Sequence, residues 1–196
     1  MLKENKIISV LTIENSSLAV DLAKCLFDSG IRNLEITLRT KEAKKATELI
    51  INTNLDFNIG IGTVLTKGDL SFAKNIGADF ALSPSTDIKL IKESFKIDFK
   101  FIPGVSSSTD INTSTILGCK ILKLFPTIQL GGLSYFKSIY SPFKSFDVKF
   151  IALGGINDKN AEDFIKNELF IGVGASWIAT KELINNKDWK EISRRA

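Results

Sequence analysis

Histidine is absent from this 196-residue sequence, and cysteine, methionine and proline are scarce. Without histidine the chain cannot build a serine–histidine–aspartate triad, a histidine-ligated zinc site or a histidine general base. The two cysteines, Cys25 and Cys119, form no metal-ligand spacing, and each falls in an apolar setting that suits a small buried side chain. Any acid–base chemistry must therefore come from carboxylates, lysines, tyrosines or water.

Long apolar runs and long charge blocks are missing too. No run is long enough to cross a bilayer, and the N-terminal segment, where Lys3, Glu4 and Lys6 precede a short apolar run, lacks a signal-peptide pattern. We therefore expect a cytoplasmic protein with no membrane partner. The net charge of +4 comes from lysines mixed with carboxylates, as in 41–45, which is typical of solvated helix faces. No recognition motif accompanies these lysines, so no nucleic-acid partner is expected.

The sequence does contain a regular alternation of short β-rich runs and amphipathic stretches. Hydrophobic spacing and turn residues predict strands over 7–11, 33–38, 58–61, 80–82, 100–102, 120–124, 148–152 and 170–173. They predict helices over 16–29, 41–52, 67–76, 86–94, 107–117, 133–140, 158–167 and 179–186. The result is eight β units, each followed by an α unit.

Strict alternation predicts a parallel sheet, because each helix returns the chain to start a parallel neighbour. Eight such units can close into a (β/α)8 TIM barrel. Glycine or polar residues recur just after the strands, at the rim where barrel enzymes place their sites. An open doubly wound sheet is the alternative. No linker divides the chain, so we expect residues 1–196 to form a single α/β TIM-barrel domain with short loops.

A lysine occupies the centre of the expected sixth strand, in the run ILKLF at 121–125. Alternate residues of a strand share a face, so Lys123 points into the barrel while the leucines on either side face the helices. Burying an unpaired ammonium is costly. A neutral lysine is a nucleophile that can form a Schiff base with a carbonyl compound. Lys123 is therefore a candidate catalytic residue.

The same alternation of faces, which we call parity, applies to the expected second strand. Glu35 and Arg39 alternate with leucine and isoleucine positions and belong on the inner face. Parity thus brings Lys123, Glu35 and Arg39 to one barrel mouth: an amine, a carboxylate that can move protons and a guanidinium that can hold a carboxylate. The alternatives are a buried Glu35–Lys123 ion pair without chemistry and a surface position for Arg39.

Glycines follow the last two expected strands, as Gly154-Gly155 and as the run GVGAS at 172–176. Phosphate-binding barrels often hold the phosphate with backbone N–H groups of these two loops. The alternative is that these glycines only form tight turns with positive φ.

Six segments carry a family resemblance: LEITLRT at 34–40, GIGTVL at 60–65, IPGVS at 102–106, LKLFP at 122–126, LGGI at 153–156 and GASW at 174–177. In identity, order and spacing they resemble the class I aldolases of the KDPG/KHG family. These enzymes act on 2-keto-3-deoxy-6-phosphogluconate (KDPG) or 4-hydroxy-2-oxoglutarate (KHG). The resemblance covers essentially the whole chain.

The resemblance implies a homotrimeric TIM barrel that cleaves a 2-keto-4-hydroxy acid, most simply KDPG, to pyruvate and glyceraldehyde 3-phosphate. It implies no metal and no organic cofactor. Lys123 matches the Schiff-base lysine, and Glu35 matches the carboxylate that shuttles protons. The implied substrate-binding residues are Arg39 and Thr63 for the pyruvate carboxylate, Phe125 against the substrate, and Gly154, Gly155, Gly174 and Ser176 for the phosphate.

The chain departs from the family pattern mostly around the distal part of the substrate. Ser85 and Ala175 replace glycines, Leu153 replaces a threonine, Thr127-Ile128 replaces Ala-Glu, and the first strand lacks the usual Pro-Val and a nearby arginine. The choice among KDPG, its galactonate epimer, KHG and an unphosphorylated sugar acid therefore stays open. A phosphate-binding isomerase or epimerase, and a non-catalytic anion-binding barrel, are the alternative functions.

Overall fold

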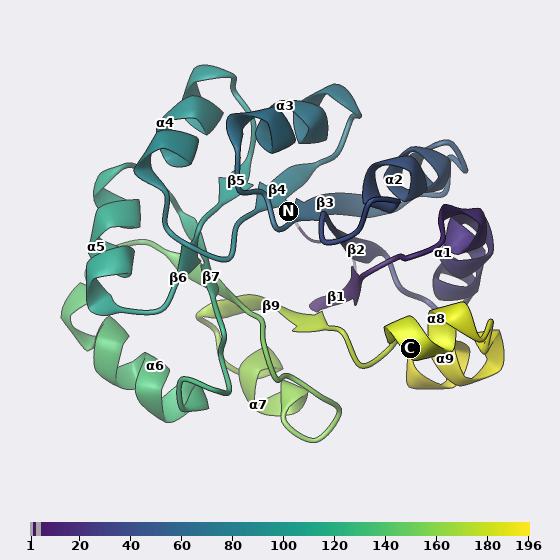
Figure 1. Cartoon of the computed structure of the whole chain (residues 1–196). Helices are drawn as coiled ribbons and strands as arrows, with labels where there is room; N and C mark the ends of the chain where they lie inside the picture. Colours follow the sequence, from purple (N-terminus) through teal and green to yellow (C-terminus); the bar gives the residue numbers. More distant parts are fainter. Residues whose placement is uncertain (1, 3–4) are drawn as a thin grey trace.

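The computed structural model describes residues 2 and 5–196 (Figure 1). Within this part of the chain, nine parallel strands form a nearly closed barrel with helices around it, which confirms the TIM-barrel prediction. The strands are β1 Ile7–Leu11, β2 Asn33–Thr37, β3 Asn58–Gly62, β4 Phe80–Leu82, β5 Phe101–Ile102, β6 Gly104–Val105, β7 Ile121–Leu124, β8 Lys149–Ala152 and β9 Phe170–Ala175. Their order around the sheet is β5-β4-β3-β2-β1-β9-β8-β7-β6.

Two short strands, β5 and β6, lie on either side of Pro103 where the sequence predicts one strand ending at residue 102. β5 pairs with β4, and β6 pairs with β7. Because proline has no N–H to donate, the ladder is interrupted between them. The Pro103 carbonyl still accepts a hydrogen bond from the Lys123 N–H at 2.9 Å. The eight-unit plan therefore holds, but our expected strand over 100–102 stopped too early, since extended chain continues to Val105.

Seven of the described α-helices lie between successive strands, and the last two follow β9. The helices are α1 Ala19–Asp28, α2 Ala43–Ile51, α3 Lys67–Asn75, α4 Ile88–Lys96, α5 Ser108–Ile116, α6 Gly132–Tyr140, α7 Ala161–Ile165, α8 Lys181–Asn185 and α9 Trp189–Arg195; η1 Ser16–Leu18 and η2 Ser141–Phe143 are 3-10 turns. We did not predict α9, which packs beside α1 and α8. None of the described helices is long and apolar enough to cross a membrane.

A capping box starts two of the described helices within a few residues of the preceding strand. The Thr66 side chain accepts from the Asp69 N–H, and Asp69 in turn accepts from the Thr66 N–H, so both orphan donors at the start of α3 are satisfied. Ser107 and Asp110 form the same arrangement at the start of α5. The strand-to-helix loops after β3 and β6 are therefore short, as expected.

The two faces of the strands are packed differently, as parity predicts. Leu34, Ile36, Leu122 and Leu124 lie fully buried between barrel and helices. The barrel interior holds a separate cluster formed by Ile8, Phe80, Leu82, Ile102, Ile151 and Leu153. This cluster fills part of the barrel interior with apolar side chains. Polar side chains on the inner face are therefore exceptions to an apolar environment.

Candidate active site

Lys123 and Glu35 meet inside the barrel. Lys123 comes from β7 and Glu35 from β2, strands separated by β1, β9 and β8 in the sheet. The Lys123 Nζ donates to Glu35 Oε1 at 3.2 Å, and the two side chains are 3% and 1% exposed. Alternate-residue geometry predicted both directions, and the structure brings the amine and the carboxylate into contact.

Only one oxygen of the Glu35 carboxylate is used by this contact. Oε2 is buried and makes no hydrogen bond within the described residues. An unsatisfied buried acceptor costs about 1–3 kcal/mol, and such groups often belong to functional sites. One oxygen can therefore hold or take a proton of Lys123 while the other faces a reacting group.

Two glycines of β3 leave space for inward side chains, and one of them leaves space for the Glu35 carboxylate. A Cβ built on Gly62 would overlap Glu35 Oε1 and lie 2.7 Å from its Cγ and Cδ, so only glycine leaves space for the carboxylate. A Cβ on Gly60 would overlap the Phe80 ring in the barrel interior. We predicted no role for either glycine in the site. Glycine at alternate, inward positions of one strand was the available signal.

Arg39 and Thr63 lie together at the rim. The sequence predicts a strand to residue 38, but β2 ends at Thr37, so Arg39 lies in the following turn and is exposed. Its Nε donates to Thr63 Oγ1 at 3.2 Å. Thr63 has a φ of 61°, which is rare for a β-branched residue. Such backbone strain clusters at ligand sites, where surrounding structure maintains it.

Phe125 forms an apolar wall beside the amine. Its ring centroid lies 5.2 Å from the Lys123 Nζ, within range of a cation–π interaction. Phe125 and Val10 are half-buried and pack against the interior cluster, next to Leu153. The wall beside Lys123 is therefore apolar, while the β2–β3 side carries Glu35, Arg39 and Thr63.

The two glycine loops expected to hold phosphate lie after β8 and β9. Gly154 and Gly155 have φ values of 97° and 74°, so both need glycine. Ser176 is exposed and begins the turn after β9. Within residues 2 and 5–196, the N–H groups of Gly155 and Ser176 donate to no other group. Two free N–H groups in neighbouring loops can receive an anion.

Gly174 has a different environment. It is buried in β9, where a Cβ would lie 2.5 Å from the Cγ of Leu153 and 3.2 Å from Val10 Cγ2. Leu153, which stands where the family pattern has threonine, thus fills the space above Gly174. In this chain, Gly174 is therefore a position where the side chains of Leu153 and Val10 pack closely against the backbone.

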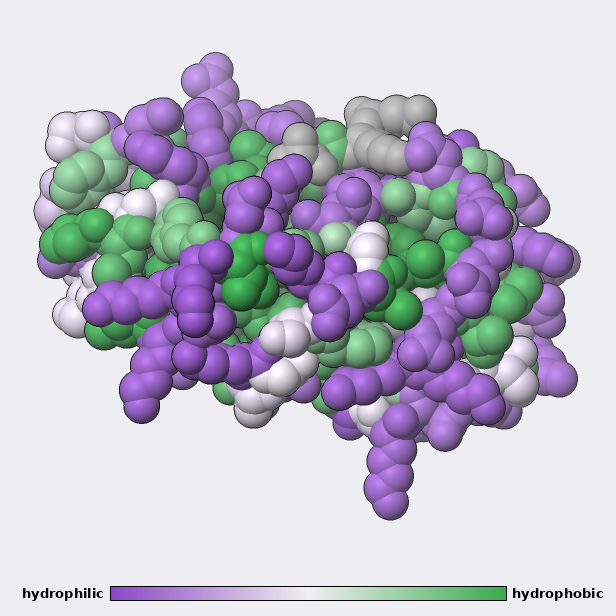
Figure 2. Space-filling view, turned by 90° about the horizontal axis from the view of Figure 1, so that it is seen from above, coloured by the Kyte–Doolittle hydropathy of each residue, from purple (hydrophilic) through white to green (hydrophobic). Residues whose placement is uncertain are grey.

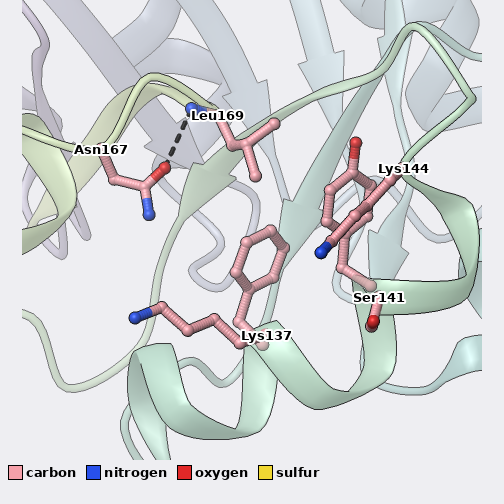
Figure 3. A pocket seen from close by; sticks show the side chains of 7 residues that line it. Lys137, Ser141, Lys144, Asn167 and Leu169 are labelled. Carbon is pink, nitrogen blue, oxygen red and sulfur yellow. Dashed lines mark hydrogen bonds between the residues drawn. The ribbon is translucent and has the colours of Figure 1, made fainter.

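A large hollow lies outside the barrel and apart from these residues (Figure 3). Its volume is about 530 Å³, and it is lined by Phe136, Lys137, Tyr140, Ser141, Lys144, Asn167 and Leu169. The Asn167 side chain accepts from the Leu169 N–H at 3.0 Å on one edge of it. Burial and the charge of Asp147 raise the pKa of the Tyr140 hydroxyl. No candidate catalytic residue lines this hollow.

The comparisons with known proteins agree with this geometry. A family model described as KDPG and KHG aldolase matches residues 1–195. A 2-dehydro-3-deoxy-phosphogluconate aldolase from Haemophilus influenzae is 32% identical over 98% of this chain and 90% of its own length. The KHG/KDPG aldolase of Escherichia coli K12 is 30% identical over 100% of this chain and 91% of its own length.

A solved structure is also similar. The KDPG aldolase from Legionella pneumophila, with pyruvate captured at low pH as a covalent carbinolamine intermediate, is 39% identical. It matches with a TM-score of 0.91 over 97% of this chain and 91% of that one. From the matched family model, the relatives of 30% identity or more and the barrel with its buried lysine–glutamate pair, we conclude that this chain belongs to the KDPG and KHG aldolase family.

Proposed function

We propose that this chain is a class I aldolase that cleaves KDPG to pyruvate and glyceraldehyde 3-phosphate through a Schiff base on Lys123. The observation that carries the proposal is the contact between Lys123 Nζ and Glu35 Oε1 inside the barrel, at 3.2 Å. The covalent pyruvate intermediate of the Legionella relative supports the same chemistry.

The reaction begins with a proton transfer within the pair. Lys123 passes a proton to Glu35, and the neutral amine attacks the C2 ketone. Glu35 returns its proton to the hydroxyl of the carbinolamine, which leaves as water and gives an iminium. Glu35, again a carboxylate, removes the C4-hydroxyl proton directly or through water, and the C3–C4 bond breaks with its electrons entering the iminium. The aldehyde leaves. The enamine is then protonated at C3 and hydrolysed, which releases pyruvate and Lys123.

The remaining residues bind the two ends of the substrate in this proposal. Arg39 and Thr63 hold the pyruvate carboxylate, which suits a guanidinium placed beside a hydroxyl at the rim. Phe125 packs against the substrate. The phosphate is received by the loops that contain Gly154, Gly155, Gly174 and Ser176, and the free N–H groups of Gly155 and Ser176 support this part. No metal or organic cofactor takes part.

Borohydride trapping with pyruvate tests the proposal. We expect a mass gain of about 72 Da, the reduced pyruvyl adduct, on the peptide that contains Lys123. The exposed neighbour Lys120 is the matched control, because Lys120→Met should keep the adduct. A pyruvate-release assay with KDPG, its galactonate epimer, KHG and 2-keto-3-deoxygluconate should show KDPG as the best substrate. Sugar-phosphate isomerisation without an adduct would favour the isomerase instead.

A homotrimer is the second part of the proposal, and exposed apolar side chains support a contact between copies. Leu65, Ile88, Phe95 and Ile116 are large, exposed and placed around α3, α4 and α5. Figure 2 views the face that is uppermost in Figure 1, where α3 and α4 lie, and shows hydrophobic patches between hydrophilic side chains. Exposed apolar patches often mark protein contacts.

Light scattering on the purified protein tests the assembly. We expect a mass of about three times the 21.6 kDa of one chain. Ile88→Asp combined with Phe95→Asp should shift this mass to that of a monomer, because two charges would be buried in the contact. Phe146→Asp, which changes an exposed phenylalanine elsewhere, should leave it unchanged. A monomeric wild type would refute the homotrimer.

Three further expectations remain predictions of the sequence. They are a single domain over residues 1–196, a cytoplasmic location, and the lack of nucleic-acid and membrane partners. The proposed substrate, a small anionic keto acid, is consistent with each of them.

A further inference from the structure

The turn that carries Ser176 is tied to the last helix of the chain. Arg195, in the final turn of α9, donates from Nη1 to the backbone carbonyl of Trp177 at 2.9 Å. The same guanidinium donates from Nε to Glu191 Oε1 at 2.7 Å. Trp177 is the residue after Ser176, so this side chain spans from α9 to the proposed phosphate turn.

Arg194 shares the carboxylate but not the turn. Its Nε and Nη2 donate to Glu191 Oε2 and Oε1, both at 2.7 Å, and its side chain is largely exposed. Neither of these bonds reaches Trp177. The two neighbouring arginines therefore carry the same charge and the same carboxylate partner, and they differ in the bond to the Trp177 carbonyl.

This part of α9 also faces the other glycine loop. A hollow of about 390 Å³ is lined by Asp158, Trp177, Arg194 and Arg195. Asp158 lies three residues after Gly155, in the loop after β8. The negative charge of Asp158 contributes to the raised pKa of Arg194, behind the larger effect of Glu191. The end of α9 is thus adjacent to both loops that the proposed function assigns to the phosphate.

The Glu191 carboxylate, which holds Arg195, keeps its charge over the pH range in which enzymes usually work. Hydrogen bonds from Arg194 and Arg195 lower the pKa of the Glu191 carboxyl to about 2. Glu191 is therefore a carboxylate at neutral pH and in mild acid, and it holds Arg195 in one orientation through a charge-assisted bond. A planar guanidinium held in this way can fix the position of a peptide carbonyl.

We propose that Arg195 is a positioning residue, which holds the turn after β9 so that the Ser176 N–H and hydroxyl meet the anionic distal group of the substrate. The inference rests on the proposed function. An exposed turn without this bond would sample several backbone conformations, and the ligand would have to order it on binding. The bond to the Trp177 carbonyl orders the turn before the ligand binds, so the ligand does not have to order it.

The test compares a phosphorylated with an unphosphorylated substrate in three variants. For Arg195→Ala we expect KM for KDPG to rise about tenfold while kcat stays within about twofold, because the ordering cost falls on phosphate binding. KM for 2-keto-3-deoxygluconate should not change. Arg195→Lys should recover part of the KDPG affinity, since an ammonium can still reach the carbonyl. Arg194→Ala should match the wild type.

A second readout is independent of turnover. Inorganic phosphate is titrated into the wild type and Arg195→Ala, and binding is followed through the NMR signal of the Ser176 N–H. We expect about tenfold weaker binding in the variant. Equal KM changes for both substrates would show a merely structural role, and equal effects of Arg194→Ala and Arg195→Ala would show a general charge effect. Either result overturns the inference.

The two proposals fail in different ways. Absence of the pyruvate adduct in the wild type would contradict the aldolase mechanism, whereas the phosphate titration would still report on the turn. A normal adduct in every variant, together with unchanged phosphate binding in Arg195→Ala, would contradict only the positioning role. Thermal melting of each variant establishes that it is folded before kinetics are compared.

Discussion

Replacing Lys123 by methionine should abolish aldol cleavage and also destabilise the fold. The nucleophile is lost, so no iminium can form, and turnover should fall to the level of the uncatalysed reaction. Stability falls for a separate reason, because the Glu35 side chain is 1% exposed and Lys123 is the only hydrogen-bond partner of its carboxylate within the described residues. Breaking a buried ion pair by removing one partner costs about 3–5 kcal/mol, since it leaves an uncompensated charge.

A double variant separates the two effects. Glu35→Gln in the Lys123→Met background removes the stranded charge, so most of the lost unfolding free energy should return while activity stays absent. Both quantities can be measured together, by chemical denaturation and by pyruvate release. Lys120→Met, at an exposed position just before β7, controls for the loss of one lysine. Full stability of the single variant would mean that Glu35 is not held as a charged partner.

The sequence predicted this pair because strand parity is a local property. A buried strand must direct its one charged residue inward or outward, and the leucine and isoleucine side chains beside Lys123 and Glu35 occupy the helix-facing side. The (β/α)8 plan followed in the same way from the alternation of patterns. Such features need no knowledge of how distant segments pack.

The features that sequence reasoning missed depend on contacts between distant segments. In β3, Gly60 lies opposite Glu35, and the Glu35 carboxylate occupies the space beside Gly62. This requires the register of two strands and the direction in which one side chain leans. The bond from Arg195 to Trp177 joins a helix to a turn 18 residues earlier. Neither contact has a periodic signal in the sequence.

The alternation of inward and outward side chains ends before Arg39 is reached. Alternation placed it on the same face as Glu35, but β2 ends at Thr37, and the Leu38 N–H donates to the Gly62 carbonyl as the chain begins to turn. Parity holds only while the strand continues, so it does not explain the exposed position of Arg39 in the turn after β2, which is close to the surface alternative left open by the sequence. The contact with Thr63 comes from that turn, and it is consistent with a carboxylate bound at the mouth.

Gly62→Ala should produce the second large effect, since one methyl group competes with the Glu35 carboxylate for the same space. The backbone at Gly62 does not have positive φ, so alanine is tolerated there conformationally and only the overlap with Glu35 matters. Glu35 must move, which disrupts its 3.2 Å contact with Lys123. We expect kcat to fall at least about a hundredfold, because the proton-transfer geometry is lost.

The pyruvate adduct should persist in Gly62→Ala, because Lys123 itself is retained. Overpacking should cost about 1–3 kcal/mol of unfolding free energy, so stability needs its own control. Gly60→Ala meets the Phe80 ring instead of Glu35 and should lose comparable stability with a smaller loss of kcat. Gly68→Ala, in α3 with its nearest atom at 3.6 Å, should gain about 0.5–1 kcal/mol and keep kcat. If Gly60→Ala and Gly62→Ala lost kcat equally, the loss would follow from general distortion of the barrel. A selective loss in Gly62→Ala would instead show that β3 positions the carboxylate by leaving space for it.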